Sequence, residues 1–235
     1  YEISLLFFVT VVALYVWMGG LKGVMYTDAF QGVIMFIGMA FLLIFVYNKM
    51  GGITSAHDQL THLFDKPDVQ EQTAKLIKGG FNGWTSMPAW GSPIWWSLVT
   101  TIIMGVGIGV LAQPHLVVRF MTVKSNREIN RAALSGGVFI LMMTGVAFVV
   151  GSLSNVFFYN ETGQIALISA GGSDKIIPSF IKQFVPSWFG IIFFLALIAA
   201  AMSTLSSQFH AMGTAIGRDI YEKALTRKGS TMFIN

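Results

Sequence analysis

Five stretches of this chain are long and apolar enough to cross a lipid bilayer as helices. About 30 Å of hydrocarbon takes roughly 17–25 helical residues, and such stretches run at about 3–21, 29–47, 94–118, 132–158 and 189–216. Hydrophobic residues make up 54% of the chain and charged residues 11%, whereas soluble domains carry about 25% charged residues. The sequence therefore predicts an all-α integral membrane protein with about five transmembrane helices, in a single transmembrane domain over residues 1–235.

Composition and motif content exclude several other classes of protein. The chain has no cysteine, which excludes disulfide frameworks and thiolate metal sites. Its net charge of +4 is small and scattered, so we expect no nucleic-acid partner. No HExxH metal motif, GxSxG nucleophile elbow or phosphate-binding loop occurs in the sequence, and we expect a protein that is not an enzyme. The chain begins at Tyr1 rather than at a methionine, and we expect a truncated chain.

The basic residues of the loops predict an orientation in the membrane. If the five spans alternate, one side carries nine Lys and Arg residues: Lys22, Arg119, Lys124, Arg127, Arg131, Arg218, Lys223, Arg227 and Lys228. The other side carries six: Lys49, Lys66, Lys75, Lys78, Lys175 and Lys182. Because cytoplasmic loops are enriched in positive charge, we expect Tyr1 to lie outside the cell and Asn235 in the cytoplasm, in a multi-pass protein of the cell membrane.

A cluster of hydroxyl groups interrupts the last apolar stretch, in "AAAMSTLSSQ" at residues 199–208. At about 100° per residue, Ala200, Ser203, Thr204 and Ser207 share one helix face, with Ser206 beside them. Small residues let membrane helices pack closely, and Ser or Thr can bond to the carbonyl four residues earlier. Alternatively, the hydroxyls supply part of an oxygen shell for a small cation such as sodium, completed by another segment. The spacing alone leaves both interpretations open.

A second polar segment, "GGLKGVMYTDAFQG" at residues 19–32, joins the first two predicted spans. Here Gly19 and Gly20 end the first span, Thr27 can cap the second span, and Asp28 falls in its first turn. An acid in that position is stabilised by the helix dipole, which is one interpretation. The other is that Asp28, with Gln31 near it, helps a cation leave toward the cytoplasm.

The third predicted span contains helix-breaking residues, in "GVGIGVLAQPHLVVRFM" at residues 105–121. Three glycines alternate with apolar residues there, and Pro114 interrupts the hydrogen-bond ladder. We expect this helix to kink or unwind, which leaves backbone groups free to meet a ligand.

Together these segments resemble the sodium/solute symporter family, which includes sodium–glucose, sodium–proline and pantothenate carriers. The resemblance rests on "GGLKGVMYTDAFQG", "QPHLVVRFMTVKS" and "ALIAAAMSTLSSQ", in that order along the chain. It implies part of a leucine-transporter-type bundle, a ten-helix core of two inverted five-helix repeats. This chain is similar to core helices four to eight, with residues 1–47 ending the first repeat, 48–93 forming an outer connecting loop and 94–235 starting the second repeat. The missing helices of the same full-length transporter are then needed for a complete site.

The resemblance also implies functional residues. One sodium site in the family uses a backbone carbonyl and two adjacent hydroxyls of the eighth helix, which correspond to Ala200, Ser203 and Thr204. Some members hold a second sodium ion with further serines and an aspartate of the fifth helix, which correspond to Ser203, Ser206, Ser207 and Asp28. For the substrate, the resemblance implies the segment that contains Val106, Val110, Gln113 and Pro114. Valines at positions where proline and sugar carriers place aromatic or polar residues favour a small or partly apolar organic solute.

The predicted function is sodium-coupled symport of a small organic solute across the cytoplasmic membrane. Sodium is the coupling ion, and the solute and the lipid bilayer are the other partners. One alternative is a proton-coupled carrier of the same fold, in which Asp28 carries the proton and the hydroxyls only pack. Another is a non-transporting scaffold, or a fragment that is inactive by itself.

Overall fold

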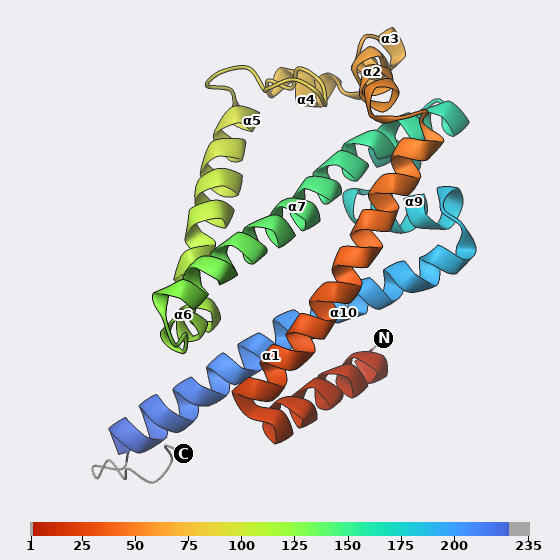
Figure 1. The fold of residues 1–235 in the computed structure, drawn as a ribbon. Helices are drawn as coiled ribbons and strands as arrows, with labels where there is room; N and C mark the ends of the chain where they lie inside the picture. The colour runs from red at the N-terminus through yellow and green to blue at the C-terminus, as the bar shows by residue number, and fades with distance from the viewer. Residues whose placement is uncertain (1, 226–235) are drawn as a thin grey trace. The chain divides into compact units, whose positions relative to one another are not determined.

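Helices make up nearly the whole of the chain, for which the computed structural model describes residues 2–225 (Figure 1). No strand occurs among these residues. The α-helices are α1 (Glu2–Lys49), α2 (Ile53–Phe64), α3 (Pro67–Gln72), α4 (Ala74–Lys78), α5 (Pro93–Trp96), α6 (Pro114–Met121), α7 (Asn126–Thr162), α8 (Ala166–Ser169), α9 (Ile176–Phe184) and α10 (Ser187–Thr214). Two π-helices, η1 (Ser97–Ile108) and η4 (Ala215–Leu225), and two 3₁₀ turns, η2 (Gly109–Ala112) and η3 (Ser173–Lys175), extend or connect them.

Within residues 2–225, four helical segments are long and apolar enough to cross a membrane: Glu2–Lys49, Pro93–Ala112, Asn126–Thr162 and Ser187–Glu222. This confirms the all-α membrane class but corrects the predicted start of the second span. The α1 helix is divided at Gly20 (φ 52°, ψ −155°), one of the two glycines expected to end the first span, but residues 22–28, expected to join the spans, are helical. A positive φ costs glycine little, so the chain turns sharply at Gly20 (Figure 1). The basic residues Arg227 and Lys228 and the two chain ends, Tyr1 and Asn235, lie outside the described residues.

The glycine- and proline-containing span breaks where the sequence predicts it to break. The helix that starts at Pro93 continues as η1 and η2 and stops at Gln113, before α6 starts with Pro114. Proline disfavours the helical conformation in the residue before it and has no N–H to donate. The carbonyl of Gln113 accepts the backbone N–H groups of Leu116 at 3.0 Å and Val117 at 3.1 Å, so it begins the new helix. The span is therefore shorter than the predicted 94–118.

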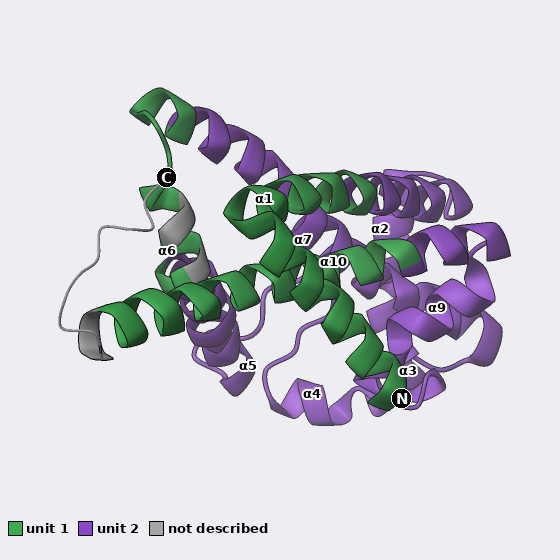
Figure 2. Cartoon of the chain, turned by 90° about the horizontal axis from the view of Figure 1, so that it is seen from below, with its two compact units in different colours: residues 1–35, 112–129, 195–235 green, residues 36–111, 130–194 purple. Residues whose placement is uncertain are grey.

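The described chain divides into two compact units (Figure 2). Unit 1 contains residues 1–35, 112–129 and 195–235, and unit 2 contains residues 36–111 and 130–194. Several long helices contribute to both units, because α1, α7 and α10 each run through a boundary.

Unit 2 has an aromatic core. Phe158, Phe180 and Phe189 have no exposed surface, and the rings of Phe41 and Phe189 stack with centroids 4.3 Å apart. Phe184 packs against Phe158 and Phe180 at centroid distances of 5.1 and 5.4 Å. Fully burying one such side chain contributes about 1.5–3 kcal/mol, so these rings hold the end of α1, α7, α9 and the start of α10 together.

The polar connection at residues 48–93 is folded against this core. The apolar face of α2, with Ala56, Leu60 and Leu63, is buried. Gln72 bridges to the turn after α7: its Nε2 donates to the Gly163 carbonyl at 3.1 Å, and its Oε1 accepts the Ile165 N–H at 2.8 Å. These bonds close a connection between segments more than 90 residues apart in the sequence.

Gly80 allows the chain to turn back tightly near the end of the connection at residues 48–93. Gly80 has φ +96°, its carbonyl accepts the Ala89 N–H at 2.8 Å, and a Cβ built there would collide with the side chain of Ser92.

We expect Gly80→Ala to destabilise the protein by about 1–3 kcal/mol, through backbone strain and this collision. Gly91→Ala is the control, since Gly91 also has positive φ (+72°) but open space around it. Thermal unfolding in detergent measures both; a Gly80→Ala loss no larger than the control's contradicts the steric argument.

A second prediction concerns the pH dependence of the link between α3 and α7. The Tyr159 hydroxyl donates to Oδ2 of Asp68 at 2.7 Å, and this hydrogen bond lowers the pKa of Asp68 below its ordinary value of 3.8. A lowered folded-state pKa means that the link stabilises fully above pH 3.8 and is lost as the pH falls through the lower folded value. Titration of the Asp68 carboxyl by carbon NMR should show its pKa rising toward 3.8 in Tyr159→Phe. Tyr47→Phe, which removes a hydroxyl bonded to His57, should leave it unchanged; an equal response in both variants contradicts the assignment.

Candidate cation site

Two helices of unit 1 bring a carboxylate and two hydroxyl groups together. Asp28 of α1 accepts hydrogen bonds from Ser206 Oγ to Oδ1 at 3.1 Å and from Ser207 Oγ to Oδ2 at 3.2 Å. Ser206 is fully buried, and Ser207 is 8% exposed. The serines belong to α10, 178 and 179 residues further along the chain. An ionisable side chain in an apolar helix is expensive and faces the protein interior, which is where Asp28 meets its partners.

The same two hydroxyls have a second acceptor on their own helix. Ser206 Oγ and Ser207 Oγ each lie 3.0 Å from the carbonyl oxygen of Ser203. A hydroxyl has one proton and two lone pairs, so each serine donates either to Asp28 or to Ser203. When the proton points to Ser203, the hydroxyl oxygen can present a lone pair to a cation beside the carboxylate.

Asp28 is not in the first turn of a helix, which corrects one sequence interpretation. The second part of α1 starts after Gly20, so Asp28 lies in its third turn, where the dipole of the helix end has little effect. Thr27 does not cap this helix either. Its hydroxyl donates within the helix to the carbonyls of Gly23 and Val24, both at 3.0 Å. The position of Asp28 therefore needs an explanation other than the helix dipole.

Ala200, Ser203 and Thr204 form a separate group on α10. The Thr204 hydroxyl donates to the Ala200 carbonyl at 3.0 Å, and Thr204 is exposed. This is the local bond expected if the hydroxyls only satisfy themselves on their own helix. Because Thr204 is exposed, its hydroxyl oxygen stays accessible to a further ligand.

Gln31 adds a buried acceptor that sequence reasoning noted only as a neighbour of Asp28. It is 8% exposed, and its Oε1 is the buried side-chain oxygen without a hydrogen-bond partner among the described residues. It follows Asp28 by three positions and therefore lies on the same helix face. An unsatisfied buried acceptor costs about 1–3 kcal/mol, and a bound cation is one way to satisfy it. In the sequence, the spacing of three residues between Asp28 and Gln31 was the signal that both side chains lie on one helix face.

Tyr15 is a further contact in unit 1 that the sequence did not reveal. Its hydroxyl donates to the Met202 carbonyl at 3.3 Å, one residue before Ser203. The bond ties the part of α1 before Gly20 to α10, so it holds the helix on which the serines lie.

The predicted substrate residues are divided between the two units. Val106 of η1 is 58% exposed and Val110 of η2 is half-buried, both in unit 2. Gln113 and Pro114 belong to unit 1, at the break before α6, and are exposed. Their role in substrate binding stays a prediction.

Comparison with known proteins identifies the family. The sequence profile of the sodium:solute symporter family matches residues 1–232. The chain is 29% identical over 224 residues to the sodium/pantothenate symporter of Haemophilus influenzae, covering 95% of this chain and 41% of that protein. It is 28% identical over 227 residues to the high-affinity proline transporter PutP of Bacillus subtilis, a match that covers 94% of this chain and 41% of that protein. The sodium/proline symporter of Staphylococcus aureus is 26% identical over 250 residues, a match that covers 100% of this chain and 42% of that protein.

These relatives are transporters rather than enzymes, and the chain spans about two fifths of their length. No solved structure matches the chain. The match to the family profile agrees with the four apolar helices of a multi-pass membrane protein. The chain belongs to the sodium:solute symporter family.

Proposed function

We propose that this chain is the part of a sodium-coupled symporter that holds the coupling ion, and that the full-length protein carries a small organic solute across the cytoplasmic membrane. One observation carries the proposal: the Asp28 carboxylate lies within hydrogen-bond distance of two buried hydroxyls from another membrane helix. Carboxylate, hydroxyl and carbonyl oxygens suit a hard cation. The family name and the names of the relatives support sodium as that cation.

The proposed inner ligands are the Asp28 carboxylate, the hydroxyls of Ser206 and Ser207, and Gln31 Oε1. In the ion-bound state, both serine protons turn to the Ser203 carbonyl, 3.0 Å from each oxygen. The carboxylate then neutralises the ion, and the neutral oxygens replace part of its hydration shell. Because Gln31 Oε1 has no hydrogen-bond partner among the described residues, it gains a contact on binding without losing one.

The proposed second group of ligands is the Ala200 carbonyl and the hydroxyls of Ser203 and Thr204. These three oxygens provide about half of a sodium shell, and the outward face of Thr204 is where further ligands can approach. By the family resemblance, those ligands come from the first core helix of the full-length transporter. We therefore expect this chain alone to bind sodium weakly at this group and not to transport.

The sodium gradient and the membrane potential drive uptake in this proposal. Each charge moved inward gains about 2.3 kcal/mol per 100 mV, and sodium and solute must raise each other's affinity reciprocally. The excess of Lys and Arg in the predicted cytoplasmic loops supports release of sodium inward past Asp28. Residues 1–47 and 94–235 then belong to two inverted repeats that residues 48–93 join on the outer side.

The proposed solute is a small organic carboxylate. Relatives that match along nearly the whole chain are named for pantothenate and proline, and both compounds carry a carboxylate. The apolar side chains of Val106 and Val110 suit the rest of such a molecule, with Gln113 and the backbone freed at Pro114 as polar contacts. A proton-coupled carrier is the alternative, since Asp28 is also a group that can carry a proton.

Equilibrium binding of radioactive sodium to the full-length protein tests the ion site. Asp28→Asn and the double variant Ser206→Ala, Ser207→Ala should each weaken sodium binding about tenfold to a hundredfold, because each removes charge-assisted contacts of about 1.5–3 kcal/mol. The double variant Ser203→Ala, Thr204→Ala should remove a second, independent component of sodium binding. Thr214→Ala is the control, because its hydroxyl bonds only to carbonyls of its own helix in α10.

Unchanged sodium affinity in all three variants would contradict the proposal. Uptake driven by a pH gradient, lost in Asp28→Asn and kept in Ser203→Ala, Thr204→Ala, would establish the proton-coupled alternative instead. Exchange of labelled solute across the membrane separates either carrier from a scaffold, which shows none.

Gln31→Leu tests whether the buried Gln31 oxygen binds sodium, because the variant should affect thermal stability in opposite ways without and with the ion. Without sodium, replacing an amide whose buried oxygen has no hydrogen-bond partner among the described residues by an apolar side chain of similar size should leave the melting temperature unchanged or raise it, since the cost of about 1–3 kcal/mol disappears. With sodium, the variant should lose part of the ion-dependent stabilisation that follows from ligand binding to the folded state. Gln208→Leu, at an exposed position of α10, is the control. The same sodium-dependent rise in melting temperature in Gln31→Leu and in the unaltered protein excludes Gln31 as a ligand.

A further inference from the structure

Tyr15 makes a polar contact between two membrane helices, beside the proposed ion ligands but without being one of them. Its side chain is half-buried, and its hydroxyl donates to the Met202 carbonyl of α10 at 3.3 Å. Both residues belong to unit 1. A buried tyrosine hydroxyl usually finds a hydrogen-bond partner, and the partner found here is a backbone carbonyl one residue before the cluster of hydroxyl groups.

The Met202 carbonyl is the backbone partner of a proposed ion ligand. In an α-helix, the carbonyl of residue i accepts the N–H of residue i+4, so in α10 the Met202 carbonyl is the acceptor for Ser206. A carbonyl oxygen has two lone pairs and can accept the Tyr15 hydroxyl as well. Tyr15 therefore holds the turn of α10 that presents the fully buried Ser206 to Asp28.

The two parts of α1 reach this turn of α10 from either side of Gly20. Tyr15 lies in the part before Gly20, and Asp28 lies in the part after it. Their contacts on α10, at Met202 and Ser206, are about 6 Å apart along the helix axis, because each residue rises by about 1.5 Å. The sharp turn at Gly20 thus lets α1 hold one turn of α10 twice (Figure 1).

Buried apolar residues lie beside both contacts. Val12, one turn before Tyr15, and Val24, one turn before Asp28, are buried. Residues three or four apart share a helix face, so each contact lies on a packed face of α1. On α10, Ala199 is buried one turn before Met202, and small residues let membrane helices approach closely.

The Tyr15 hydrogen bond does not depend on the ion, unlike the hydrogen bonds of the two serines. In the proposed ion-bound state, both serine hydroxyls turn from Asp28 to the Ser203 carbonyl, and they no longer join the two helices. The Tyr15 hydroxyl keeps its acceptor, because the Met202 carbonyl is not a proposed ligand. Tyr15 can therefore hold α10 in place while the ion binds and leaves.

We propose that Tyr15 is a positioning residue of the ion site, whose hydroxyl keeps Ser206 and Ser207 opposite Asp28 while their protons exchange acceptors. The proposal rests on the proposed function, since it concerns the inner ligands of that site. Ligands of a binding site must be held within about 0.5 Å of their working geometry. Loss of the hydrogen bond to Met202 frees this turn of α10 to shift, and the affinity of the inner ligands for sodium falls.

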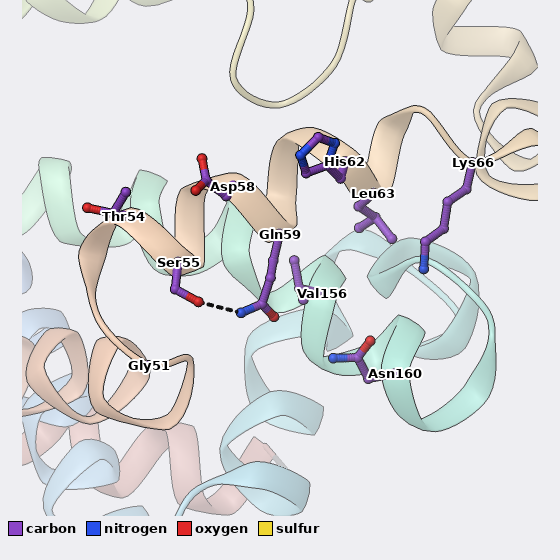
Figure 3. Close-up of a pocket in the computed structure, with 10 residues that line it drawn as sticks. All are labelled: Gly51, Thr54, Ser55, Asp58, Gln59, His62, Leu63, Lys66, Val156 and Asn160. Carbon is purple, nitrogen blue, oxygen red and sulfur yellow. Dashed lines mark hydrogen bonds between the residues drawn. The ribbon is translucent and has the colours of Figure 1, made fainter.

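Equilibrium binding of radioactive sodium to the full-length protein tests this role. Tyr15→Phe keeps the ring and removes the hydroxyl, and it should weaken sodium binding at the inner ligands about threefold to tenfold, as the loss of one neutral hydrogen bond does. Tyr26→Phe is the matched control, because Tyr26 belongs to the same helix and unit and is 79% exposed. Ser55→Ala is a second control, because Ser55 Oγ accepts the Gln59 amide N–H at 3.0 Å in unit 2 (Figure 3). Both controls should bind sodium as the unaltered protein does.

A double-mutant cycle separates positioning of the serines from general support of the fold. In the double variant Ser206→Ala, Ser207→Ala, Tyr15→Phe should have no further effect on sodium affinity, because no serine hydroxyl is left to position. A merely structural role, or direct contact of Tyr15 with the ion, gives the same loss in both backgrounds and overturns the proposal. Weaker sodium binding that comes with a much lower melting temperature than that of Ser55→Ala assigns the hydroxyl to stability and overturns it as well.

The outcomes also distinguish this proposal from the ion site on which it rests. If Asp28→Asn and the double serine variant weaken sodium binding and Tyr15→Phe does not, only the role of Tyr15 is overturned. If Asp28→Asn leaves sodium binding unchanged, the ion site itself is wrong, and the role of Tyr15 at that site is overturned with it.

Discussion

Hydrocarbon offers no hydrogen-bond partner to a backbone amide, and the structure of this chain depends on that constraint. Each apolar segment must satisfy its own N–H and carbonyl groups, which only a helix does within one segment. Departures from the α-helix in the apolar segments are found at Gly20, which adopts a positive φ, in the π-helix η4, and through η1 and η2 to the break at Gln113, before Pro114. In transporters, such breaks are the places where backbone groups become available to a ligand.

The same constraint makes the position of every polar side chain informative. Asp28 is placed in the third turn of a helix, so it needs partners from elsewhere, and it finds them in Ser206 and Ser207. Gln31 Oε1 lies one turn away without a partner among the described residues. A carboxylate, two hydroxyls with an alternative acceptor, and an unsatisfied amide oxygen form a group that needs little rearrangement to fit the proposed cation. That is the physical basis for preferring an ion site to mere helix packing.

Unit 2 shows how the polar connection between the two halves of the chain is stabilised. Aromatic packing around Phe158, Phe180 and Phe189 holds α7, α9 and the start of α10 together, while Gln72 and the Tyr159–Asp68 hydrogen bond fasten α3 to the end of α7.

The sequence by itself determined the class of structure and the chemical groups of the candidate site. Apolar length predicts membrane helices, the glycines and Pro114 predict the break in the third span, and the hydroxyls of residues 203–207 are visible without coordinates. These features are local, because helix formation and helix breaking depend on neighbours within about one turn. The family resemblance, carried by three motifs, extended this to a prediction of which residues are the ligands.

Only the tertiary structure decided which groups meet. Sequence patterns end the first span at Gly19 and Gly20, where the helix does break, but they start the second span only near residue 29. The helix resumes directly after Gly20, because the polar residues between the two apolar stretches do not prevent helix formation. That continuation moves Asp28 out of a first turn. Likewise, the bonds from Asp28 to Ser206 and Ser207 and from Tyr15 to Met202 join residues nearly 180 or more positions apart. No local pattern encodes such pairs, because they depend on how the helices pack.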